Sequence, residues 1–545
     1  MGACPSCGGE TWSVDRFCGW CGHRLQRPAA AAPPPPSEPP PSARQHTPAP
    51  PEPVVVAAAP PAEVHAQSYS ETVLFVVPEA DGPRLLGLLR QDALNHGIEV
   101  LLVRPRSALS QVQQRLRKAE AGGHLPDAVC LIGDDARIPH VRFDDDTGHD
   151  DFLLTDNPYG QTSELTEAER YAGGIVDMLP VSRIPTVDPA LVGRLLGVGD
   201  RLEPSWEGGV AVTAASWTEA SQSVLDAIRG RATVDLIDVP PTSAQQVGQQ
   251  FWARPGRVYF NVHGSDRSAD WYGDNGCGST PTALTADAVQ VRDHAIAMSE
   301  SCYGALIQSP DEALSMAFLK RGADAFVGST IIAWGPASPP CSLADLVVQE
   351  TYRALDSGLG LAAALLAARV CIADGYLSRG EALPPNALNT VASFVAYGAP
   401  LARVRGVAAS AKRVSGPAVS GGQVDRKSRS TAGVLDAVRQ GMRQGTQGQL
   451  GAARQRYRQR LPPGAWKAFS RGRMTFGQLS KLVDEPHLLQ ARLSQLAGGS
   501  VADAFVFQYA SSKRFRAFVS VAHGERRAGV LLDDAGTEVE AWVSR

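Results

Sequence analysis

The chain has 545 residues, of which 43% are hydrophobic and 20% charged, so we expect a globular protein of about two to four domains. Its formal net charge of −4 gives no electrostatic footprint for nucleic acid or an anionic membrane. The first residues, MGACPSCGGE, lack the features of a signal peptide, and no run approaches the roughly 18 apolar residues of a membrane span. We therefore expect a cytoplasmic protein whose nine cysteines are metal ligands, catalytic groups or buried side chains.

Two CxxC pairs open the sequence. Cys4 and Cys7 stand in CPSC, Cys18 and Cys21 stand in CGWC, and glycine follows the second cysteine of each pair. Two pairs at this spacing are typical of a zinc ribbon, in which four thiolates hold one tetrahedral ion. Because about 25 residues cannot bury a core of their own, the metal would supply the folding free energy. We predict a structural zinc ribbon over residues 1–26, similar to those found on many bacterial proteins; paired redox dithiols are the alternative.

Residues 27–68 are rich in proline and alanine and nearly free of large apolar side chains. Such a segment gains too little from burial to offset the entropy of ordering it. We predict an extended, disordered linker between the ribbon and the next domain.

Apolar runs alternate with helical patterns from residue 69 to residue 405. TVLFVV, IEVLLV and AVCLI indicate buried strands, while RLLGLLRQDALNHG and SALSQVQQRLRKAEAGG have helical periodicity. The alternation continues through the strand candidates GVAVTA, VYFNV, AIAMS and ADAFVGSTI. Continuous apolar strands separated by helices are typical of a mostly parallel sheet that is covered by helices on its faces. We predict one large α/β domain.

The remaining chain has a different composition. Residues 406–430 are rich in serine, glycine, lysine and arginine and indicate a second linker. Residues 431–545 predict a small, separate α+β module, because helical segments are followed by the runs FVFQYASS, RFRAFVSVAHG, RAGVLLDDAG and EVEAWVSR, which suit an antiparallel sheet. The basic stretch at 454–473 is interpreted as a solvated helix face rather than a site for an acidic partner.

Two predicted strands end in residues that carry chemistry. VYFNV leads into His263 and Gly264, and AIAMS leads into Cys302. In an open parallel sheet, reactive groups collect outside the carboxyl ends of the strands, and a nearby imidazole activates a thiol by taking its proton. We predict that Cys302 and His263 form a catalytic pair at an exposed sheet edge, with the N–H groups of Gly264 and Cys302 binding an oxyanion. The alternative is a buried cysteine and an unrelated loop histidine.

The order of these motifs resembles the gingipain family of caspase-like cysteine peptidases. Further similar segments are CLIGDDARIP at 130–139, TDNPYG at 155–160 and GSTIIAWGP at 328–336. The resemblance covers most of residues 71–404 and implies a caspase-like α/β sandwich with endopeptidase activity toward protein substrates. It also implies that Cys302 attacks the peptide carbonyl and that His263 protonates the leaving amine.

The resemblance implies a pocket for the residue before the scissile bond. Trp334 would form one wall, with a place in the core as the alternative. Arginine-cutting members have two carboxylates after the strand that corresponds to VAVTAAS, one orienting the histidine and one at the pocket floor. This chain offers only Glu219 there, with Ser216 near the orienting position. Other carboxylates that could supply charge are Glu300, Asp266 and Asp270.

Members of the family usually bind calcium. No motif of this chain corresponds to a calcium site, and RFDDDTGHDD at 142–151 predicts an acidic surface loop rather than an ion site. Structural zinc in the ribbon is therefore the cofactor that we predict.

These observations predict a cysteine endopeptidase with a Cys-His dyad, recruited or regulated by its flanking modules. Because an uncontrolled cytoplasmic protease is hazardous, we expect an activating protein partner or self-cleavage in a linker, for example near DRKSRS at 425–430. The alternative is a catalytically inactive, peptidase-like scaffold that binds protein partners, which the lone Glu219 favours. Nucleic-acid binding lacks the interleaved basic and aromatic residues that it requires, and we expect no membrane partner.

Overall fold

The computed structural model describes residues 71–406 and 466–544 with short gaps at 93–96, 177–178, 198–200, 203–208, 229–234, 254–255, 277–279, 337–338, 378, 512–513 and 525, together with residues 2–3 and 10–11. The chain divides into two compact units, Met1–Ser68 and Tyr69–Arg545. In the first unit, strand β1 (Gly2–Ala3) pairs antiparallel with β2 (Glu10–Thr11). The four cysteines of the predicted zinc ribbon, Cys4, Cys7, Cys18 and Cys21, lie outside the described residues, as does the predicted linker 27–68.

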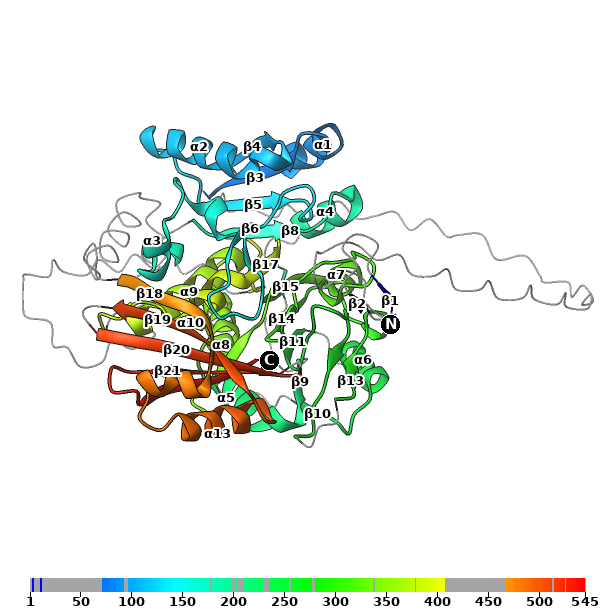
Figure 1. Ribbon diagram of the computed structural model, residues 1–545. Coiled ribbons are helices and arrows are strands. Elements are labelled where there is room, and N and C mark those ends of the chain that lie inside the picture. Colours follow the sequence, from blue (N-terminus) through cyan, green and yellow to red (C-terminus); the bar gives the residue numbers. More distant parts are fainter. Residues whose placement is uncertain are drawn as a thin grey trace, which may run out of the picture. The chain divides into compact units, whose positions relative to one another are not determined.

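A ten-stranded sheet forms the centre of the second unit, and Figure 1 shows it running between the helices. In spatial order its strands are β10 (Asp235–Val239), β9 (Val210–Ala214), β11 (Arg257–Asn261), β14 (Ala295–Ser299), β15 (Ala323–Ser329), β17 (Phe394–Gly398), β8 (Val181–Ile184), β5 (Ala128–Ile132), β3 (Thr72–Pro78) and β4 (Gly97–Val103). All neighbours pair in parallel except β15 and β17, which join two parallel halves through one antiparallel pair. The prediction of an α/β domain with a mostly parallel sheet is confirmed.

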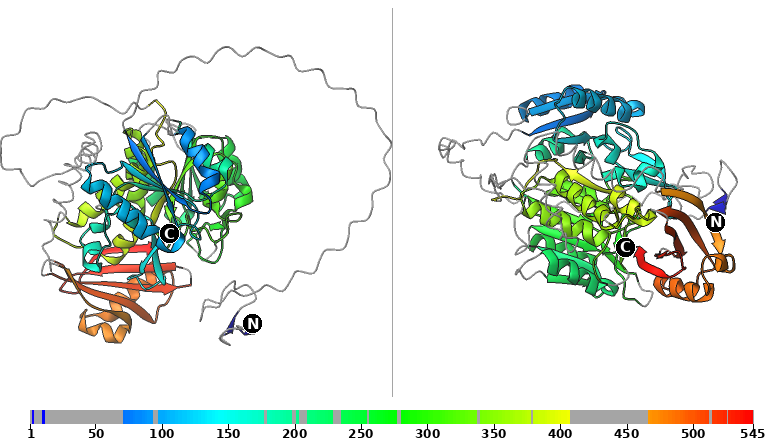
Figure 2. Two further views of the ribbon diagram at one scale, coloured as in Figure 1. Left: turned by 90° about the horizontal axis from the view of Figure 1, so that it is seen from above. Right: turned by 90° about the vertical axis from the view of Figure 1, so that its left-hand side faces the viewer.

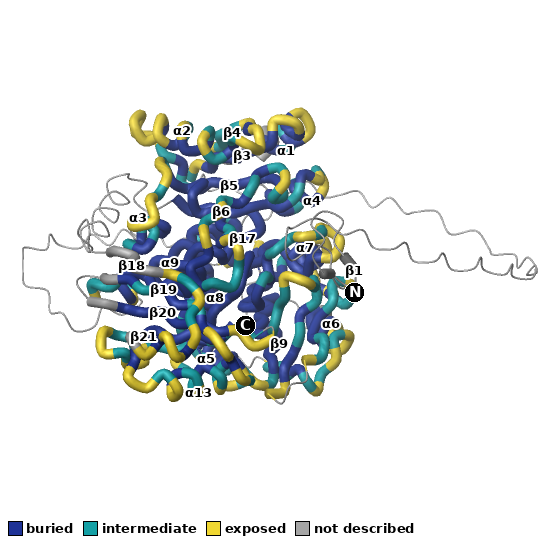
Figure 3. Tube along the Cα trace, viewed as in Figure 1, coloured by how far each residue is buried: buried dark blue, intermediate teal, exposed yellow. Residues whose placement is uncertain are grey.

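Helices cover both faces of this sheet (Figures 1 and 2). Those of residues 71–406 are α1 (Gly82–Asp92), α2 (Ala108–Ala121), α3 (Glu167–Tyr171), α4 (Pro189–Leu196), α5 (Thr218–Ile228), α6 (Ala244–Ala253), α7 (Leu314–Lys320), α8 (Ala344–Asp356), α9 (Leu361–Leu377) and α10 (Pro385–Ser393). Along β14, Ile296 and Met298 enter one hydrophobic core while Ala295 and Ala297 enter the other. Burial on both faces explains why the central strands are continuous apolar runs, drawn dark blue in Figure 3.

Two short antiparallel strand pairs lie in the connections between the strands of the central sheet. They are β6 (Val141–Asp144) with β7 (Phe152–Thr155) and β12 (Trp271–Tyr272) with β13 (Thr282–Leu284), both antiparallel. None of the helices in the part of the chain described here is long and apolar enough to span a bilayer.

The C-terminal residues form a second, antiparallel sheet, drawn in orange to red beside helices α8 to α10 in Figures 1 and 2. Its strands, in spatial order, are β16 (Trp334–Pro336), β22 (Glu538–Ser544), β21 (Arg526–Leu532), β20 (Arg514–His523), β19 (Asp503–Ser511) and β18 (Trp466–Thr475), and α13 (Pro486–Ala497) packs on it. The predicted antiparallel runs are therefore present. Residues 466–473, the end of the basic stretch predicted to be a helix face, instead form part of strand β18 and pair with β19; residues 454–465 of that stretch lie outside the described residues.

This sheet is continuous with the first domain, whereas the sequence predicts a separate module. Strand β16 belongs to the α/β region and pairs with the last strand, β22. Side chains of the sheet alternate between two cores: Val519 and Val530 pack under α13, whereas Phe518 and Leu531 join the core that contains Met298. Residues 517–521 of β20 and 528–532 of β21 are buried without a break because both faces of the sheet are covered there.

Candidate active site

Strands β11 and β14 bring His263 and Cys302 to the same level of the sheet. The two strands are parallel neighbours, and Arg257 pairs with Ile296 while Phe260 pairs with Ser299. Continued three residues beyond the last pair, the same register sets His263 opposite Cys302. Both residues therefore leave adjacent strands at the carboxyl edge of the sheet, where ligand sites of open α/β sheets form.

Gly264 lies directly against the main chain of Cys302. A Cβ atom on Gly264 would stand 1.8 Å from the carbonyl oxygen of Cys302 and 3.3 Å from its nitrogen. Only glycine permits this approach, since real Cβ atoms do not come so close to other heavy atoms. The contact joins the two strand ends, as expected if the backbone at Gly264 and Cys302 lines one site.

The imidazole of His263 lies between an acid and an indole. Its Nε2 is 3.4 Å from Oδ2 of Asp274, and its ring centroid is 4.2 Å from that of Trp217. Asp274 is fully buried; it accepts hydrogen bonds from the hydroxyl of Ser216 at 3.1 Å and from the N–H of Gly276 at 2.8 Å. These bonds fix the carboxylate beside the imidazole, so Asp274 can orient His263.

Asp274 is not among the residues predicted from the sequence, because only the fold brings it near His263. Tyr272 on β12 exchanges two backbone hydrogen bonds with His263, each 2.8 Å long, and Asp274 follows two residues later. The signal that could have revealed it is the DNG turn after an aromatic pair, since an aspartate at such a turn is held by local N–H groups.

Cys302 is buried rather than exposed, so the prediction of an exposed thiol is wrong. The residue is only 4% exposed and belongs to the core shared with the C-terminal sheet. Its Sγ accepts a hydrogen bond from the N–H of Ala333 at 3.4 Å and donates to the carbonyl of Ala333 at 3.7 Å. The sulfur is thus held against the segment that leads from β15 into β16.

The residue after the thiol has a left-handed backbone. Tyr303 has φ 56°, a conformation that costs a non-glycine residue about 1–2 kcal/mol. Two contacts hold it: its N–H donates to the carbonyl of Ile331 at 2.8 Å, and its hydroxyl donates to Asp150 at 2.6 Å. Asp150 also accepts from the N–H of Ile332 at 3.4 Å and therefore ties the loops after β14 and β15 together.

Burial raises the pKa of Asp150 to about 7, with the negative charge of Asp145 adding to the effect and the hydrogen bond from Tyr303 opposing it. Asp150 therefore carries a partial proton near neutral pH.

The predicted acidic surface loop at 142–151 is wrong in its middle part, which is interior, whereas Arg142, Asp144 and Asp151 are exposed. Asp145 and Asp146 are buried and Thr147 is inaccessible. Asp145 accepts hydrogen bonds from the N–H groups of Thr147, His149 and Asp150 and from the amide of Asn389. These donors occupy its lone pairs. Among the described residues no group of three or more His, Cys, Asp or Glu could hold a metal ion, and nothing here supports calcium.

The other candidate pocket residues are dispersed. Trp334 is fully buried, with its ring 5.7 Å from His149 and 6.1 Å from Phe518 of the C-terminal sheet. Glu300 is fully buried and accepts a hydrogen bond from the hydroxyl of Tyr259 at 2.8 Å. Glu219 lies exposed in the first turn of α5. Glu300 precedes Cys302 by two residues in the chain, and Trp334 directly follows Ala333, whose backbone contacts the sulfur of Cys302.

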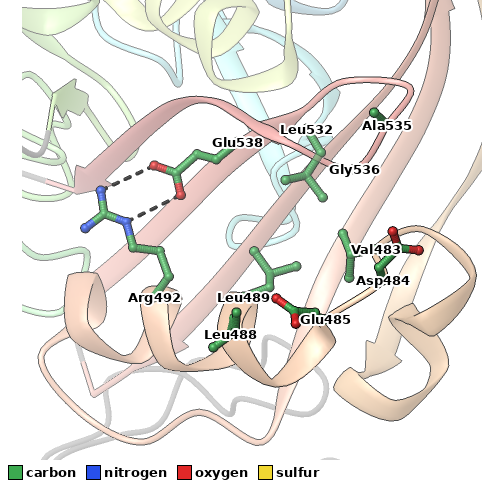
Figure 4. Close-up of a pocket in the computed structure, with 10 residues that line it drawn as sticks. All are labelled: Val483, Asp484, Glu485, Leu488, Leu489, Arg492, Leu532, Ala535, Gly536 and Glu538. Carbon is green, nitrogen blue, oxygen red and sulfur yellow. Dashed lines mark hydrogen bonds and ion pairs between the residues drawn. The ribbon is translucent and has the colours of Figure 1, made fainter.

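A pocket of about 510 Å³ lies elsewhere, between α13 and the hairpin of β21 and β22 (Figure 4). It is lined by Val483, Asp484, Glu485, Leu488, Leu489, Arg492, Leu532, Ala535, Gly536 and Glu538. It includes none of the candidate catalytic residues.

No protein-family model and no curated protein matches the chain. Two solved structures are similar to it. One is the crystal structure of gingipain R, an Arg-specific cysteine proteinase, with 12% identity and a TM-score of 0.46 over 63% of this chain and 80% of that one. The other is described as a protease, with 13% identity and a TM-score of 0.44 over 62% of this chain and 79% of that one.

Proposed function

We propose that residues 69–405 form a cysteine endopeptidase domain with Cys302 as nucleophile and His263 as its acid-base partner. The observation that carries the proposal is the register of β11 and β14, which, continued three residues beyond its last pair, aligns His263 with Cys302 at the carboxyl edge of the sheet. The contact of Gly264 with the main chain of Cys302 supports it.

Each residue has a distinct role in the proposed reaction. His263 takes the thiol proton, and the thiolate of Cys302 attacks the peptide carbonyl carbon. The oxyanion is bound by the N–H groups of Gly264 and Cys302. His263 then protonates the leaving amine, the C–N bond breaks, and water hydrolyses the thioester to release the acid and the thiol. Asp274, rather than Glu219 or Ser216, would orient the imidazole, because its carboxylate faces Nε2.

The test is cleavage of a randomised peptide pool by the full chain. Cys302→Ala and His263→Ala should lose cleavage. The matched control is Cys341→Ala, whose half-buried thiol donates to the hydroxyl of Ser223 and whose pKa is raised to about 11 by burial. This control should cleave like the wild type. The pool is also given to Arg526→Ala, since Arg526 contacts the Asp274 carboxylate. If neither the wild type nor Arg526→Ala gives cleavage products that depend on Cys302, the proposal is overturned.

A catalytically inactive scaffold that binds protein partners is the second candidate. It is favoured by the burial of Cys302 and by the hydrogen bonds of its sulfur to Ala333. A thiol-directed peptide probe separates the two functions: labelling of Cys302 that depends on His263 supports the peptidase, and labelling that ignores His263 supports the scaffold.

The N-terminal cysteines would hold a structural zinc ion, and the folded ribbon would recruit the peptidase domain to a protein partner. The check is zinc content of the purified chain: Cys4→Ser and Cys18→Ser should each lower it from one equivalent toward none. An unchanged zinc content contradicts the assignment.

A further inference from the structure

We propose that the C-terminal sheet inhibits the candidate site in cis: β22 lies on the β16 edge, where an extended peptide substrate would pair, while Arg526 holds Asp274. This inference rests on the proposed peptidase function and adds its regulation.

The edge of β16 is where a substrate strand would be expected. β16 begins at Trp334, immediately after Ala333, whose N–H and carbonyl contact the sulfur of Cys302. A protease must bind its substrate as an extended chain beside the nucleophile, and an exposed strand edge offers such a chain a row of backbone hydrogen bonds. A peptide that pairs with β16 therefore passes next to the thiol.

Strand β22 takes this edge. It pairs antiparallel with β16, so that Trp542 is opposite Pro336, Val543 is opposite Gly335 and Ser544 is opposite Trp334. Along these three residues β22 advances toward Ala333 and the sulfur. The edge of β16, which begins next to the residue that contacts the sulfur, is thus occupied by a strand of the same chain.

Aromatic packing seals the same place. Trp334 is fully buried, its ring meets that of Phe518 edge-on, and Trp542 lies 6.3 Å from Phe518 in turn. Gly529 of β21 lies beside the same indole, since a Cβ on it would be in van der Waals contact with Trp334 at 3.6 Å. The C-terminal sheet therefore excludes both water and substrate from Trp334.

Arg526 adds an electrostatic contact. It begins β21 at the end of the hairpin from β20, and its guanidinium pairs with Oδ2 of Asp274, the oxygen that faces Nε2 of His263. Asp274 is fully buried, and a guanidinium is the strongest partner available to a buried carboxylate. While this pair persists, the acid that would orient His263 is shared with the C-terminal sheet.

Further contacts far from Cys302 hold the sheet closed. Arg471 pairs with Asp146 at 2.6 Å, the hydroxyl of Ser520 donates to the carbonyl of Thr147 at 2.7 Å, and Arg516 pairs with Glu381 at 3.1 Å. Because these contacts remain when those at Arg526 and β22 are weakened, the end of β22 beside β16 should open locally while the rest of the C-terminal sheet stays packed.

The test is the rate at which iodoacetamide alkylates Cys302 in the native full chain. Residues 293–320 form a tryptic peptide with Cys302 as its one cysteine, so mass spectrometry reads this site alone. Arg526→Ala removes the pair with Asp274. Val543→Pro removes an N–H from the middle of the strand between β16 and β21. Each variant should alkylate roughly tenfold faster than the wild type.

Two matched controls make the same kinds of substitution, arginine to alanine and valine to proline, at positions of the C-terminal sheet away from Asp274 and β16. Arg473→Ala removes an arginine of the same sheet that is 66% exposed and pairs with Asp503. Val539→Pro places proline in the same strand at an exposed position beside the register shift of β22 with β21, outside the part that pairs with β16. Both should alkylate at the wild-type rate.

Cys130 reports on global unfolding, because it is fully buried in β5 and is the one cysteine of the tryptic peptide 119–137. A variant in which Cys130 is alkylated as fast as Cys302 has unfolded. If Val543→Pro unfolds in this way, the result for Arg526→Ala alone tests the proposal. Wild-type alkylation of Cys302 in Arg526→Ala, with Cys130 protected, overturns the proposal.

Cleavage of the peptide pool separates this inference from the proposed function. Faster alkylation of Cys302 in the opened variants, with no cleavage by any variant, supports occlusion by the C-terminal sheet and contradicts the proposed peptidase. Equal cleavage by the wild type and both opened variants supports the proposed peptidase and contradicts inhibition by the C-terminal sheet.

Discussion

Replacing Asp150 by asparagine should change how stability depends on pH. Burial raises the pKa of Asp150 from 3.8 to about 7. In the unfolded chain the group ionises near its ordinary value, so between about pH 4 and pH 7 the folded state binds one more proton than the unfolded state. The contribution of Asp150 to stability is therefore present in full below pH 4 and is lost as pH rises through 7.

The magnitude follows from linkage. One extra proton in the folded state lowers the free energy of unfolding by about 1.4 kcal/mol for each pH unit, and the shift of about 3 units corresponds to about 4 kcal/mol in all. The hydrogen bonds that Asp150 accepts from Tyr303 and Ile332 favour the ionised form and oppose the effect of burial.

The assay is urea unfolding of the wild type and Asp150→Asn at pH 5, 6, 7 and 8. Plotted as wild type minus variant, the free energy of unfolding should fall by about 2 kcal/mol between pH 5 and pH 7 and then level off. Asp151→Asn, at the exposed neighbouring position, controls for the removal of one carboxyl group. A difference that stays constant from pH 5 to pH 8 would refute the assignment of a raised pKa to Asp150.

Three further predictions concern the site and its scaffold. Gly264→Ala should lower Cys302-dependent cleavage by more than about tenfold, because its Cβ would collide with the carbonyl of Cys302, whereas Gly375→Ala, with open space around it, should leave cleavage unchanged. In the Arg526→Ala chain, Asp274→Asn should reduce kcat by about a hundredfold or more if Asp274 orients the imidazole, and an unchanged kcat would remove it from that role. Arg183→Ala should lower the free energy of unfolding by about 3–5 kcal/mol in urea, because it leaves the buried Asp156 without its bidentate partner at 2.9 and 2.5 Å; a loss below about 1 kcal/mol would contradict this.

The central sheet could be predicted because its strands are buried on both faces. Such strands are continuous apolar runs, and helices must connect them when neighbours are parallel. The arrival of His263 and Cys302 at one edge of the sheet could also be predicted, since both follow strands of a parallel sheet; their action as a catalytic pair remains a proposal. The spacing of 39 positions between the two residues equals the register offset between β11 and β14.

The environment of the pair could not be predicted, because it depends on segments distant in the chain. Asp274 returns to His263 through the pairing with Tyr272. Asp150 approaches Tyr303 from a loop about 150 residues earlier, and its acidic neighbours suggested solvent rather than burial. Cys302 lies in a core that includes side chains of the C-terminal sheet, and that sheet joins the α/β region through β16, which has only three residues and gives no periodic signal of its own.

The most direct test of the Cys302–His263 pair is the reaction of Cys302 with a peptide-based, thiol-directed electrophile in the Arg526→Ala chain, with and without the imidazole. If His263 activates the thiol, His263→Ala should slow the labelling of Cys302 by about a hundredfold near pH 7, while Cys130 stays unlabelled in both chains. Equal labelling rates with and without His263 would show that the two strand ends do not act together, and the proposed peptidase would fall.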